Sequence, residues 1–331
     1  MTVRGGTSRA LWLSWERHRR SRELAGALGA ELCEFESRAP WAARSAALSA
    51  RTVIRLFRTR PSLLIVQNPS IVLATVACLL KPLLGYRLIV DRHSNFFEET
   101  LAAPSPKFRV FHLLSRFTVR RADLTIVTND VLKDLLESWG GRGFILPDKL
   151  PAMALARPPL PDGEQAVVFV CSHAFDEPLA EVLEAARLLG AAYRIHVTGD
   201  SRRSDARLIR SAPANVNFTG FLDEADYQSL LASSRGVLAL TSQPNTLLCC
   251  AYEAVALGLP LVLSDQVVLT RYFRQGAVIT DHAPAAIAAA VRRVVAEQSR
   301  LRAEVADLGR ELVADWDTRF AALRRAALPD S

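Results

Sequence analysis

The sequence predicts an α/β protein with two doubly wound parallel sheets, because strand and helix patterns alternate through both halves of the chain. In the first half, short apolar runs such as "SLLIVQ", "RLIVD" and "DLTIVT" alternate with helical patterns, and "AVVFVCS", "YRIHVTGD" and "PLVLSD" repeat this in the second. A stretch with prolines at 147, 151, 158, 159 and 161 separates the halves, and such a stretch cannot continue a helix or a central strand.

These patterns divide the 331 residues into two domains. We expect a first domain over 1–146, a proline-rich linker over 147–163, a second domain over 164–300, and a last helix over 301–331 that packs back on the first domain. Two Rossmann-like sheets joined by such a hinge predict a cleft, with ligands at the carboxyl ends of the strands.

Charge is distributed unevenly between the halves. Residues 1–155 hold 23 Lys and Arg against 13 Asp and Glu, a balance of +10, while residues 156–331 have a balance of −3. The basic half predicts an anionic partner such as a phosphorylated acceptor or an anionic lipid. Nucleic acid is not expected, because the chain lacks a stacking aromatic platform and a recognition-helix motif.

Two stretches combine arginines with apolar residues, at 41–61 and 107–124. Helices of this composition often lie on an anionic membrane surface. Alternatively, their apolar faces pack on the sheet and their arginines are solvated. The sequence contains no uninterrupted apolar run of about 18 residues, so a membrane-spanning helix is not expected. The five scattered cysteines indicate cytosolic thiols. We therefore expect a cytoplasmic protein with peripheral contact at the inner face of the plasma membrane.

Four segments of the second half resemble the donor domain of GT-B glycosyltransferases, and of family 4 in particular. They are Gly199-Asp200, "NFTGF" (217–221), "GVLALTS" (236–242) and "YEAVALGLPLVLSD" (252–265). The resemblance implies a GT-B architecture, in which two Rossmann-like domains face a cleft. It also implies a UDP- or GDP-sugar donor, and no metal or other cofactor.

Glu253 lies in an apolar run, where an ionised carboxylate without a partner is costly. The resemblance implies that it matches the second glutamate of the family's E-x7-E pair and binds the donor ribose. Asn245 stands where the first glutamate is expected, so it can contact the sugar without supplying charge. The loop 243–248 leads into a helix whose N-terminal amides would meet the diphosphate. Asn245 and Thr246 alternatively only cap this helix. The other donor contacts expected from these segments are Leu247, Gly199 and Phe221.

The loop "VCSHAFDEP" (170–178) lacks the lysine that the family carries after the first strand of this domain. Ser172, His173 and a helix starting near Asp176 are expected to serve the donor instead, although His173 is equally consistent with an ordinary loop histidine. This loop, "QNPS" (67–70) and "DRHSN" (91–95) resemble the chitobiosyl-diphosphodolichol β-mannosyltransferases.

Candidate catalytic groups lie in the first half. His93 follows a predicted strand, so it is expected to contact a donor hydroxyl or leaving phosphate, or to act as a base on the acceptor. Glu16 and His18 follow the first strand and are the other candidate bases, although Glu16 is also consistent with a solvated helix start. Nearby arginines are expected to bind an acceptor or membrane phosphate, namely Arg17, Arg19 and Arg20.

The sequence thus predicts a hexosyltransferase that moves a sugar from a nucleotide-sugar donor to a glycan or lipid-linked acceptor at the cytoplasmic membrane face. A non-catalytic GT-B-like binding protein is the main alternative. A nucleotide-sugar 2-epimerase of the same fold is a third, for which the acid and histidine pattern is not found.

Overall fold

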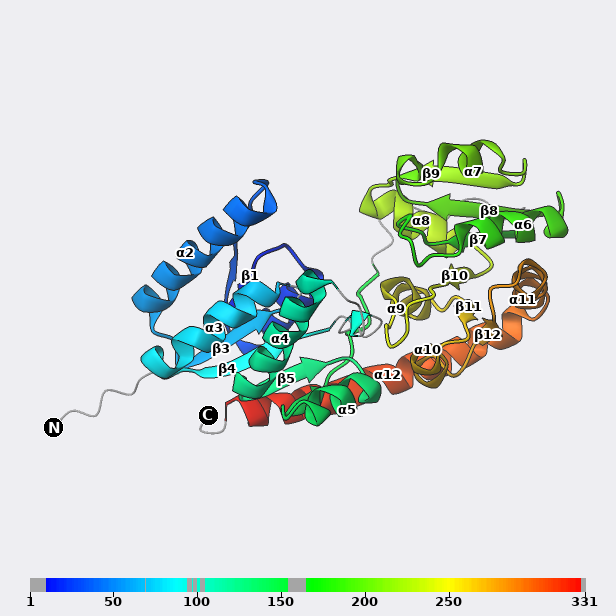
Figure 1. The fold of residues 1–331 in the computed structure, drawn as a ribbon. Helices are drawn as coiled ribbons and strands as arrows, with labels where there is room; N and C mark the ends of the chain where they lie inside the picture. The colour runs from blue at the N-terminus through cyan, green and yellow to red at the C-terminus, as the bar shows by residue number, and fades with distance from the viewer. Residues whose placement is uncertain are drawn as a thin grey trace. The chain divides into compact units, whose positions relative to one another are not determined.

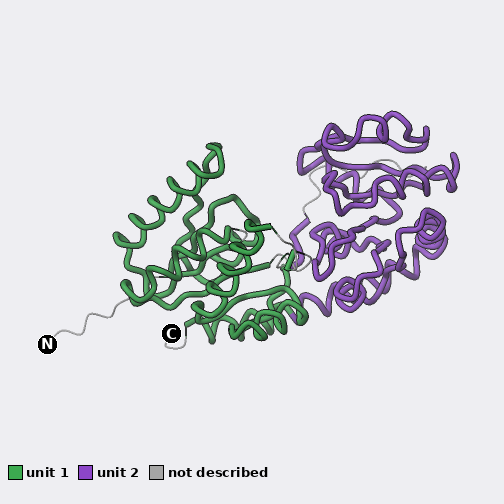
Figure 2. Tube along the Cα trace, viewed as in Figure 1, with its two compact units in different colours: residues 1–148, 316–331 green, residues 149–315 purple. Residues whose placement is uncertain are grey.

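The computed structural model describes residues 10–68, 70–93, 97, 100–101, 105–153 and 165–328. It divides the chain into two compact units, which Figures 1 and 2 show. Unit 1 comprises residues 1–148 together with 316–331, and unit 2 comprises residues 149–315. Of the predicted linker, residues 154–163 lie outside the described residues, and residues 147–153 form neither helix nor strand.

Unit 1 contains a six-stranded parallel sheet in the order β2-β1-β3-β4-β5-β6. The strands are β1 (Ala10–Ser14), β2 (Glu31–Glu34), β3 (Leu63–Gln67), β4 (Arg87–Asp91), β5 (Leu124–Val127) and β6 (Gly143–Ile145). Successive side chains of β1 point to opposite faces, so Leu11 and Leu13 enter one core and Trp12 enters the other. A central strand buried on both faces explains the continuous apolar runs of the sequence.

Helices cover both faces of this sheet. They are α1 (Arg19–Leu28), α2 (Trp41–Thr59), α3 (Ile71–Leu84), α4 (Pro106–Arg121) and α5 (Asp130–Ser138). α2 and α3 pack against the face that carries Leu11 and Leu13. α1 and the end of α12 pack against the other face, where Trp316 and Leu323 join Trp12.

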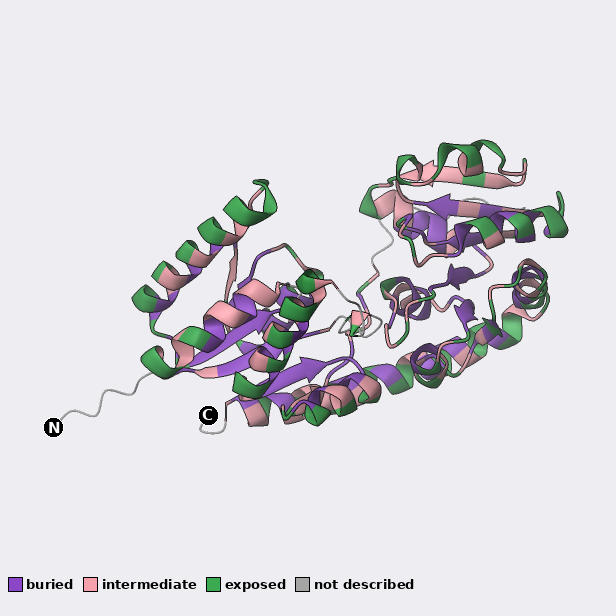
Figure 3. Ribbon diagram, in the orientation of Figure 1, coloured by how far each residue is buried: buried purple, intermediate pink, exposed green. Residues whose placement is uncertain are grey.

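Unit 2 contains a second six-stranded parallel sheet in the order β12-β11-β10-β7-β8-β9. Its strands are β7 (Gln165–Phe169), β8 (Tyr193–Thr198), β9 (Val216–Gly220), β10 (Val237–Ala239), β11 (Leu261–Ser264) and β12 (Ala277–Thr280). Its helices are α6 (Leu179–Leu189), α7 (Ala206–Arg210), α8 (Glu224–Ser233), α9 (Cys249–Ala256), α10 (Val267–Tyr272), α11 (Pro284–Ala296) and the first part of α12 (Gln298–Ala327), with the short 3-10 helix η2 (Ser201–Arg203). Figure 3 shows buried residues along the central strands of both sheets and exposed residues on the outer sides of the helices.

The last helix, predicted over 301–331, begins slightly earlier, because α11 ends at Ala296 and α12 begins at Gln298. In both sheets every strand runs in the same direction, so the loops that follow the strands gather at one edge of each sheet. The candidate site residues lie on these loops and on the helices that they enter.

Candidate functional site

Glu253 lies in the second turn of α9, and the structure gives it a partner within the protein. The hydroxyl of Tyr227 on α8 donates a hydrogen bond of 2.7 Å to Oε2 of Glu253. Burial, and next the charge of Glu253, raise the pKa of Tyr227, so the phenol keeps its proton and donates. The expectation of a carboxylate paired only by a ligand was therefore wrong. Tyr227 instead fixes the direction of a carboxylate that is only partly buried.

The helix that contains Glu253 begins directly after the predicted loop 243–248. α9 begins at Cys249, and its N-cap is Leu248, which makes no side-chain cap hydrogen bond. Asn245 and Thr246 therefore do not cap the helix. They lie in the preceding loop, where Asn245 has a φ of 61° and the Thr246 hydroxyl donates to the carbonyl of Pro244 at 3.3 Å. Leu247 follows them and is buried.

The loop after β7 is organised by a carboxylate of its own. Glu177 accepts hydrogen bonds from the amides of Ser172 and Ala174, at 2.9 and 2.8 Å, and from the Ser172 hydroxyl at 3.1 Å. α6 begins at Leu179 and not near Asp176, so its amides are displaced from the expected position. Because Glu177 already occupies the Ser172 groups that we expected to bind phosphate, a donor must compete with it for them.

His173 is an interior side chain. Its ring is 8 % exposed, with Nδ1 2.7 Å from the Ser204 hydroxyl and Nε2 3.1 Å from the carbonyl of Thr198. A carbonyl only accepts, so Nε2 carries the proton and Nδ1 accepts from Ser204. The ring thus joins the loop after β7 to the loop after β8. In this conformation it is a structural histidine, and the predicted donor contact through its ring was wrong.

Gly199 and Phe221 follow β8 and β9. A Cβ at Gly199 would lie 2.1 Å from the carbonyl oxygen of Cys171, and the residue has a φ of 87°. Only glycine therefore allows these two loops to approach so closely. Phe221 is 90 % exposed, which leaves its ring open to a ligand.

A pocket of about 220 Å³ lies between the loop after β7 and the start of α9. The described residues that line it include the two carboxylates Asp176 and Glu177 but no lysine or arginine. A diphosphate needs a cation nearby. Arg203 is a candidate, because its Nη1 donates at 3.1 Å to the carbonyl of Ser172, which lines the pocket.

Sequence reasoning missed Arg203. The family resemblance predicts a basic residue directly after the first strand of the domain, whereas Arg202 and Arg203 follow the next strand along the chain. The adjacent Arg202 is paired with Asp200 at 2.7 Å, while Arg203 is exposed. The signal that could have found it is a basic pair just beyond "YRIHVTGD", at the same edge of the sheet.

In unit 1, the three candidate catalytic residues follow β1 and β4. The rings of His18 and His93 lie 4.7 Å apart, and Nδ1 of His93 lies 3.4 Å from Oδ2 of Asp91. Burial alone would raise the pKa of Asp91, but the charge of Arg20 and the contact with His93 outweigh it and hold the pKa well below its usual range. Burial, and next the charge of His93, lower the pKa of His18. The ionised carboxylate of Asp91 thus lies beside the ring of His93, which in turn lies beside the ring of His18.

Arg20 is 4 % exposed and belongs to this interior network. Its Nε and Nη2 donate to Asp91 at 3.1 Å, Nη1 donates to Asp148 at 2.7 Å and to the carbonyl of Pro147, and Nη2 also donates to the carbonyl of Leu146. All five N–H groups are thus matched. The expectation that Arg20 binds a ligand phosphate was wrong. Arg17 and Arg19 are exposed, Arg17 beside Glu36 and Arg19 3.8 Å from Glu23.

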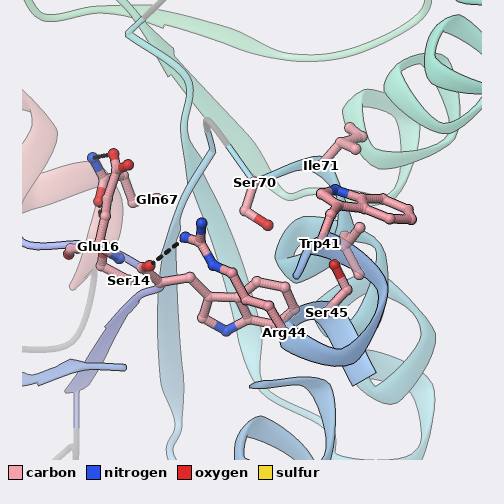
Figure 4. Close-up of a pocket in the computed structure, with 10 residues that line it drawn as sticks. Ser14, Glu16, Trp41, Arg44, Ser45, Gln67, Ser70 and Ile71 are labelled. Atoms are coloured by element: carbon pink, nitrogen blue, oxygen red, sulfur yellow. Dashed lines mark hydrogen bonds between the residues drawn. The ribbon is translucent and has the colours of Figure 1, made fainter. Parts of the chain in front are cut away.

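Glu16 lines a second pocket of about 220 Å³, at the ends of β1 and β3 (Figure 4). Gln67 Nε2 donates to Glu16 Oε1 at 3.2 Å, and the Ser14 hydroxyl donates to Gln67 Oε1. The glutamine amide is thereby fixed in orientation, and the carboxylate of Glu16 forms one side of the pocket. Among the residues that the structure describes, no group of three or more His, Cys, Asp or Glu side chains could hold a metal ion.

Solved structures share the fold of the whole chain. Sucrose-phosphate synthase from Thermosynechococcus elongatus aligns with a TM-score of 0.77 at 16 % identity, covering 98 % of this chain and 100 % of that chain. HepE from Anabaena, in complex with UDP and glucose, aligns with a TM-score of 0.74 at 12 % identity, covering 95 % and 91 %. A putative UDP-N-acetylglucosamine 2-epimerase from Listeria monocytogenes aligns with a TM-score of 0.65 at 13 % identity, covering 95 % and 97 %. These likenesses confirm the predicted GT-B fold of two Rossmann-like domains.

Two protein-family models match the sequence, one on each half. No curated protein matches it. The model described as "Glycosyl transferase 4-like domain" matches residues 5–143, and the model described as "Glycosyl transferases group 1" matches residues 164–297. Both models describe transferases, and together they span both predicted domains. The chain therefore belongs to the glycosyltransferases, with a glycosyl transferase 4-like first half and a group 1 second half.

Proposed function

We propose that this glycosyltransferase takes its sugar from a nucleotide-sugar donor bound by unit 2, and passes it to a glycan or lipid-linked acceptor bound by unit 1. The observation that carries the proposal is the carboxylate of Glu253, which Tyr227 orients on the helix that follows β10. A fixed carboxylate is a good acceptor for a pair of ribose hydroxyls. The UDP and glucose in the HepE structure favour a uridine donor, with a GDP-sugar as the second choice.

Arg203 and the exposed ring of Phe221 supply the other donor contacts in this proposal. The arginine would neutralise the diphosphate, and the phenylalanine would pack against an apolar face of the donor. No metal takes part, because Arg203 and loop amides provide the charge stabilisation. Glu177 competes with the phosphate for the Ser172 amide, so donor binding would reorganise the loop after β7.

In the reaction, the acceptor hydroxyl oxygen forms a bond to the anomeric carbon as the bond to the diphosphate oxygen breaks. The hydroxyl proton passes to a base. His93 is the first candidate, because Asp91 lies 3.4 Å from Nδ1 and would stabilise the imidazolium formed when Nε2 takes the proton. Glu16 and His18 are the other candidates. The family 4 likeness favours retention at the anomeric carbon, whereas the likeness to the chitobiosyl-diphosphodolichol β-mannosyltransferases favours inversion, which requires such a base.

Two observations favour a non-catalytic binding protein instead. Asn245 replaces a family glutamate, and the pocket beside α9 has two carboxylates and no basic side chain among its described lining residues. A protein of this kind would bind a donor weakly or not at all and would show no transfer.

Thermal unfolding with UDP-, GDP-, dTDP- and CMP-sugars distinguishes these functions. A ligand at 100 times its Kd adds about 2.7 kcal/mol of stability, enough to raise the Tm by several degrees. We expect sugars of one nucleotide class to raise the Tm. We expect Glu253→Gln to lower the affinity for them about tenfold, because one charge-assisted hydrogen bond is lost. Glu184→Gln, an exposed carboxylate on α6, is the matched control. A stabilising donor whose affinity is the same in Glu253→Gln would exclude the ribose role, and no stabilisation by any donor would favour the non-catalytic protein.

We also propose peripheral contact with an anionic membrane through α2 and α4. No described helix of the chain is long and apolar enough to cross a membrane. α2 exposes Ile54 and Phe57 beside the exposed Arg58, and α4 exposes Val110 and Leu113. Exposed apolar groups next to arginines suit the headgroup region of a bilayer that carries anionic lipid.

A further inference from the structure

The pocket at the ends of β1 and β3 combines an exposed aromatic ring, a cation and a row of polar groups. Ser14, Glu16 and Gln67 come from β1, the loop after it and β3, Trp41 and Arg44 from the first turn of α2, and Ser70 from the N-cap of α3 (Figure 4). Its volume of about 220 Å³ suits a small polar ligand or one sugar unit of a larger one. None of these residues has been given a role with a ligand so far, apart from Glu16 as a candidate base.

Trp41 is 75 % exposed at this pocket. Trp41 lines the pocket together with polar groups, and ligand pockets are commonly lined by aromatic side chains with a few well-placed polar groups. The flat face of an indole fits the C–H face of a pyranose ring, while the hydroxyl groups around the rim of the sugar stay available for hydrogen bonds.

Arg44 supplies the cation. Its Nη2 donates to the carbonyl of Trp15 at 3.1 Å, which fixes the guanidinium, and no carboxylate among the described residues pairs with it. The first turns of α2 and α3 contain no acidic residue. The remaining N–H groups of Arg44 are therefore suited to an anionic group, with the paired geometry that a carboxylate or phosphate accepts.

Glu16 adds a negative charge to the pocket, in which Arg44 is the positive group. Its carboxylate accepts from Gln67 at 3.2 Å and does not pair with Arg44. A ligand anion would be repelled by Glu16 and attracted by Arg44, whereas sugar hydroxyls can donate to Glu16. The two charges therefore favour one orientation of a ligand that carries an anion at one end and hydroxyls at the other.

We propose that this pocket binds an anionic saccharide, with its pyranose ring against Trp41, its carboxylate or phosphate at Arg44 and its hydroxyls toward Glu16. The proposal rests on the proposed function, because this saccharide would be the acceptor, or the part of the acceptor nearest the reacting hydroxyl. It identifies the acceptor class as uronate-containing or phosphorylated sugars.

Saturation-transfer difference NMR on the full chain, without a donor, tests the pocket directly. The probes are D-glucuronate, α-D-glucose 1-phosphate and neutral D-glucose, so the first two distinguish a carboxylate from a phosphate. We expect at least one charged probe to bind more tightly than glucose, and Trp41→Ala and Arg44→Ala to weaken it about tenfold or more. Arg44→Lys keeps the charge but loses the fork geometry, so it should restore only part of the affinity.

Arg142→Ala is the matched control, because Arg142 is exposed in unit 1 directly before β6, at the other edge of the sheet. Equal binding of charged and neutral probes, no binding of any probe, or charged-probe binding that Trp41→Ala and Arg44→Ala leave unchanged would each overturn the proposal. The thermal-unfolding experiment with nucleotide sugars tests binding to unit 2, whereas this pocket lies in unit 1. Donor binding without saccharide binding would reject this pocket alone, and saccharide binding without donor binding would reject the proposed function alone.

Discussion

Arg203 shows how the proposed donor site would depend on single residues. The family's basic residue after the first strand is missing from this chain, and Arg203 reaches the same loop from the next strand through its 3.1 Å hydrogen bond to the Ser172 carbonyl. Residue types along the sequence do not show which loops meet in space. For the same reason the Tyr227 partner of Glu253, 26 residues away, could not be predicted.

Arg203→Ala should lower the affinity for the nucleotide sugar about tenfold, because a charged hydrogen-bonding group at the diphosphate is lost. The nucleotide sugar used is the one that stabilises the wild type. Arg202→Ala is the matched control, since Arg202 is adjacent but pairs with Asp200. Isothermal titration calorimetry of the two variants at low and high salt makes the comparison. Equal affinities of the two variants would reject a phosphate role for Arg203.

The histidine pair predicts a pH dependence of stability. Burial, and next the charge of His93, lower the pKa of His18 from its ordinary value of 6.5. Below pH 6.5 the unfolded chain therefore binds more protons at His18 than the folded chain does. The free energy of unfolding should fall as the pH falls through this region, and it should level off above pH 6.5.

His18→Gln should reduce this dependence between pH 5 and 7. Denaturant unfolding of the wild type and the variant at several pH values measures it. His282 also has its pKa lowered, chiefly by burial, so a weaker dependence of the same sign should remain in the variant. Identical slopes in the two proteins would contradict the prediction.

At the scale of elements, the central strands could be predicted well because they are apolar runs bounded by turns. β4 (Arg87–Asp91) and β5 (Leu124–Val127) fall within the runs "RLIVD" and "DLTIVT". Helix starts were harder to predict. α9 begins directly after the predicted loop 243–248, and α6 begins at Leu179, three residues beyond Asp176. Neither helix has a side-chain cap, so the capping alternative for Asn245 was wrong.

α2 and α4 give the membrane prediction. Cosedimentation with phosphatidylcholine vesicles that contain phosphatidylglycerol should exceed that with pure phosphatidylcholine and should decrease with salt. Phe57→Ser with Arg58→Ser should reduce binding about fivefold or more, since each arginine near the surface contributes about 1 kcal/mol. Phe175→Ser is the control, because Phe175 lies in the acidic half and is even more exposed, at 90 % against 41 % for Phe57. Equal binding to both kinds of vesicle would contradict the proposed contact.

At the scale of the whole molecule, the division into two parallel-sheet units followed from the alternation of strands and helices and from the run of prolines. The last helix belongs to both units: α12 begins within unit 2, and its residues from Trp316 onward belong to unit 1. Trp316 is 6 % exposed and stacks on Phe320, with ring centroids 4.9 Å apart.

Trp316→Ala should therefore destabilise unit 1 by about 3–5 kcal/mol, the usual range for removing a buried aromatic ring. Val313→Ala lies on the same helix at a position that is 47 % exposed and should change stability little. Hydrogen exchange followed by mass spectrometry can assign the loss, which is expected in β1 and α1, whose core residues pack with Trp316. A loss of exchange protection confined to β7–β12 would contradict the prediction that Trp316 stabilises unit 1.

The path of α12 also has a consequence for the order of folding during synthesis. The ribosome completes residues 149–315 before it makes the segment that fills the core beside Trp12 and Leu24. The unit that starts first is thus finished last. Until residues 316–328 emerge, one apolar face of its sheet lacks part of its cover, and the nascent chain at that stage is a natural substrate for chaperones.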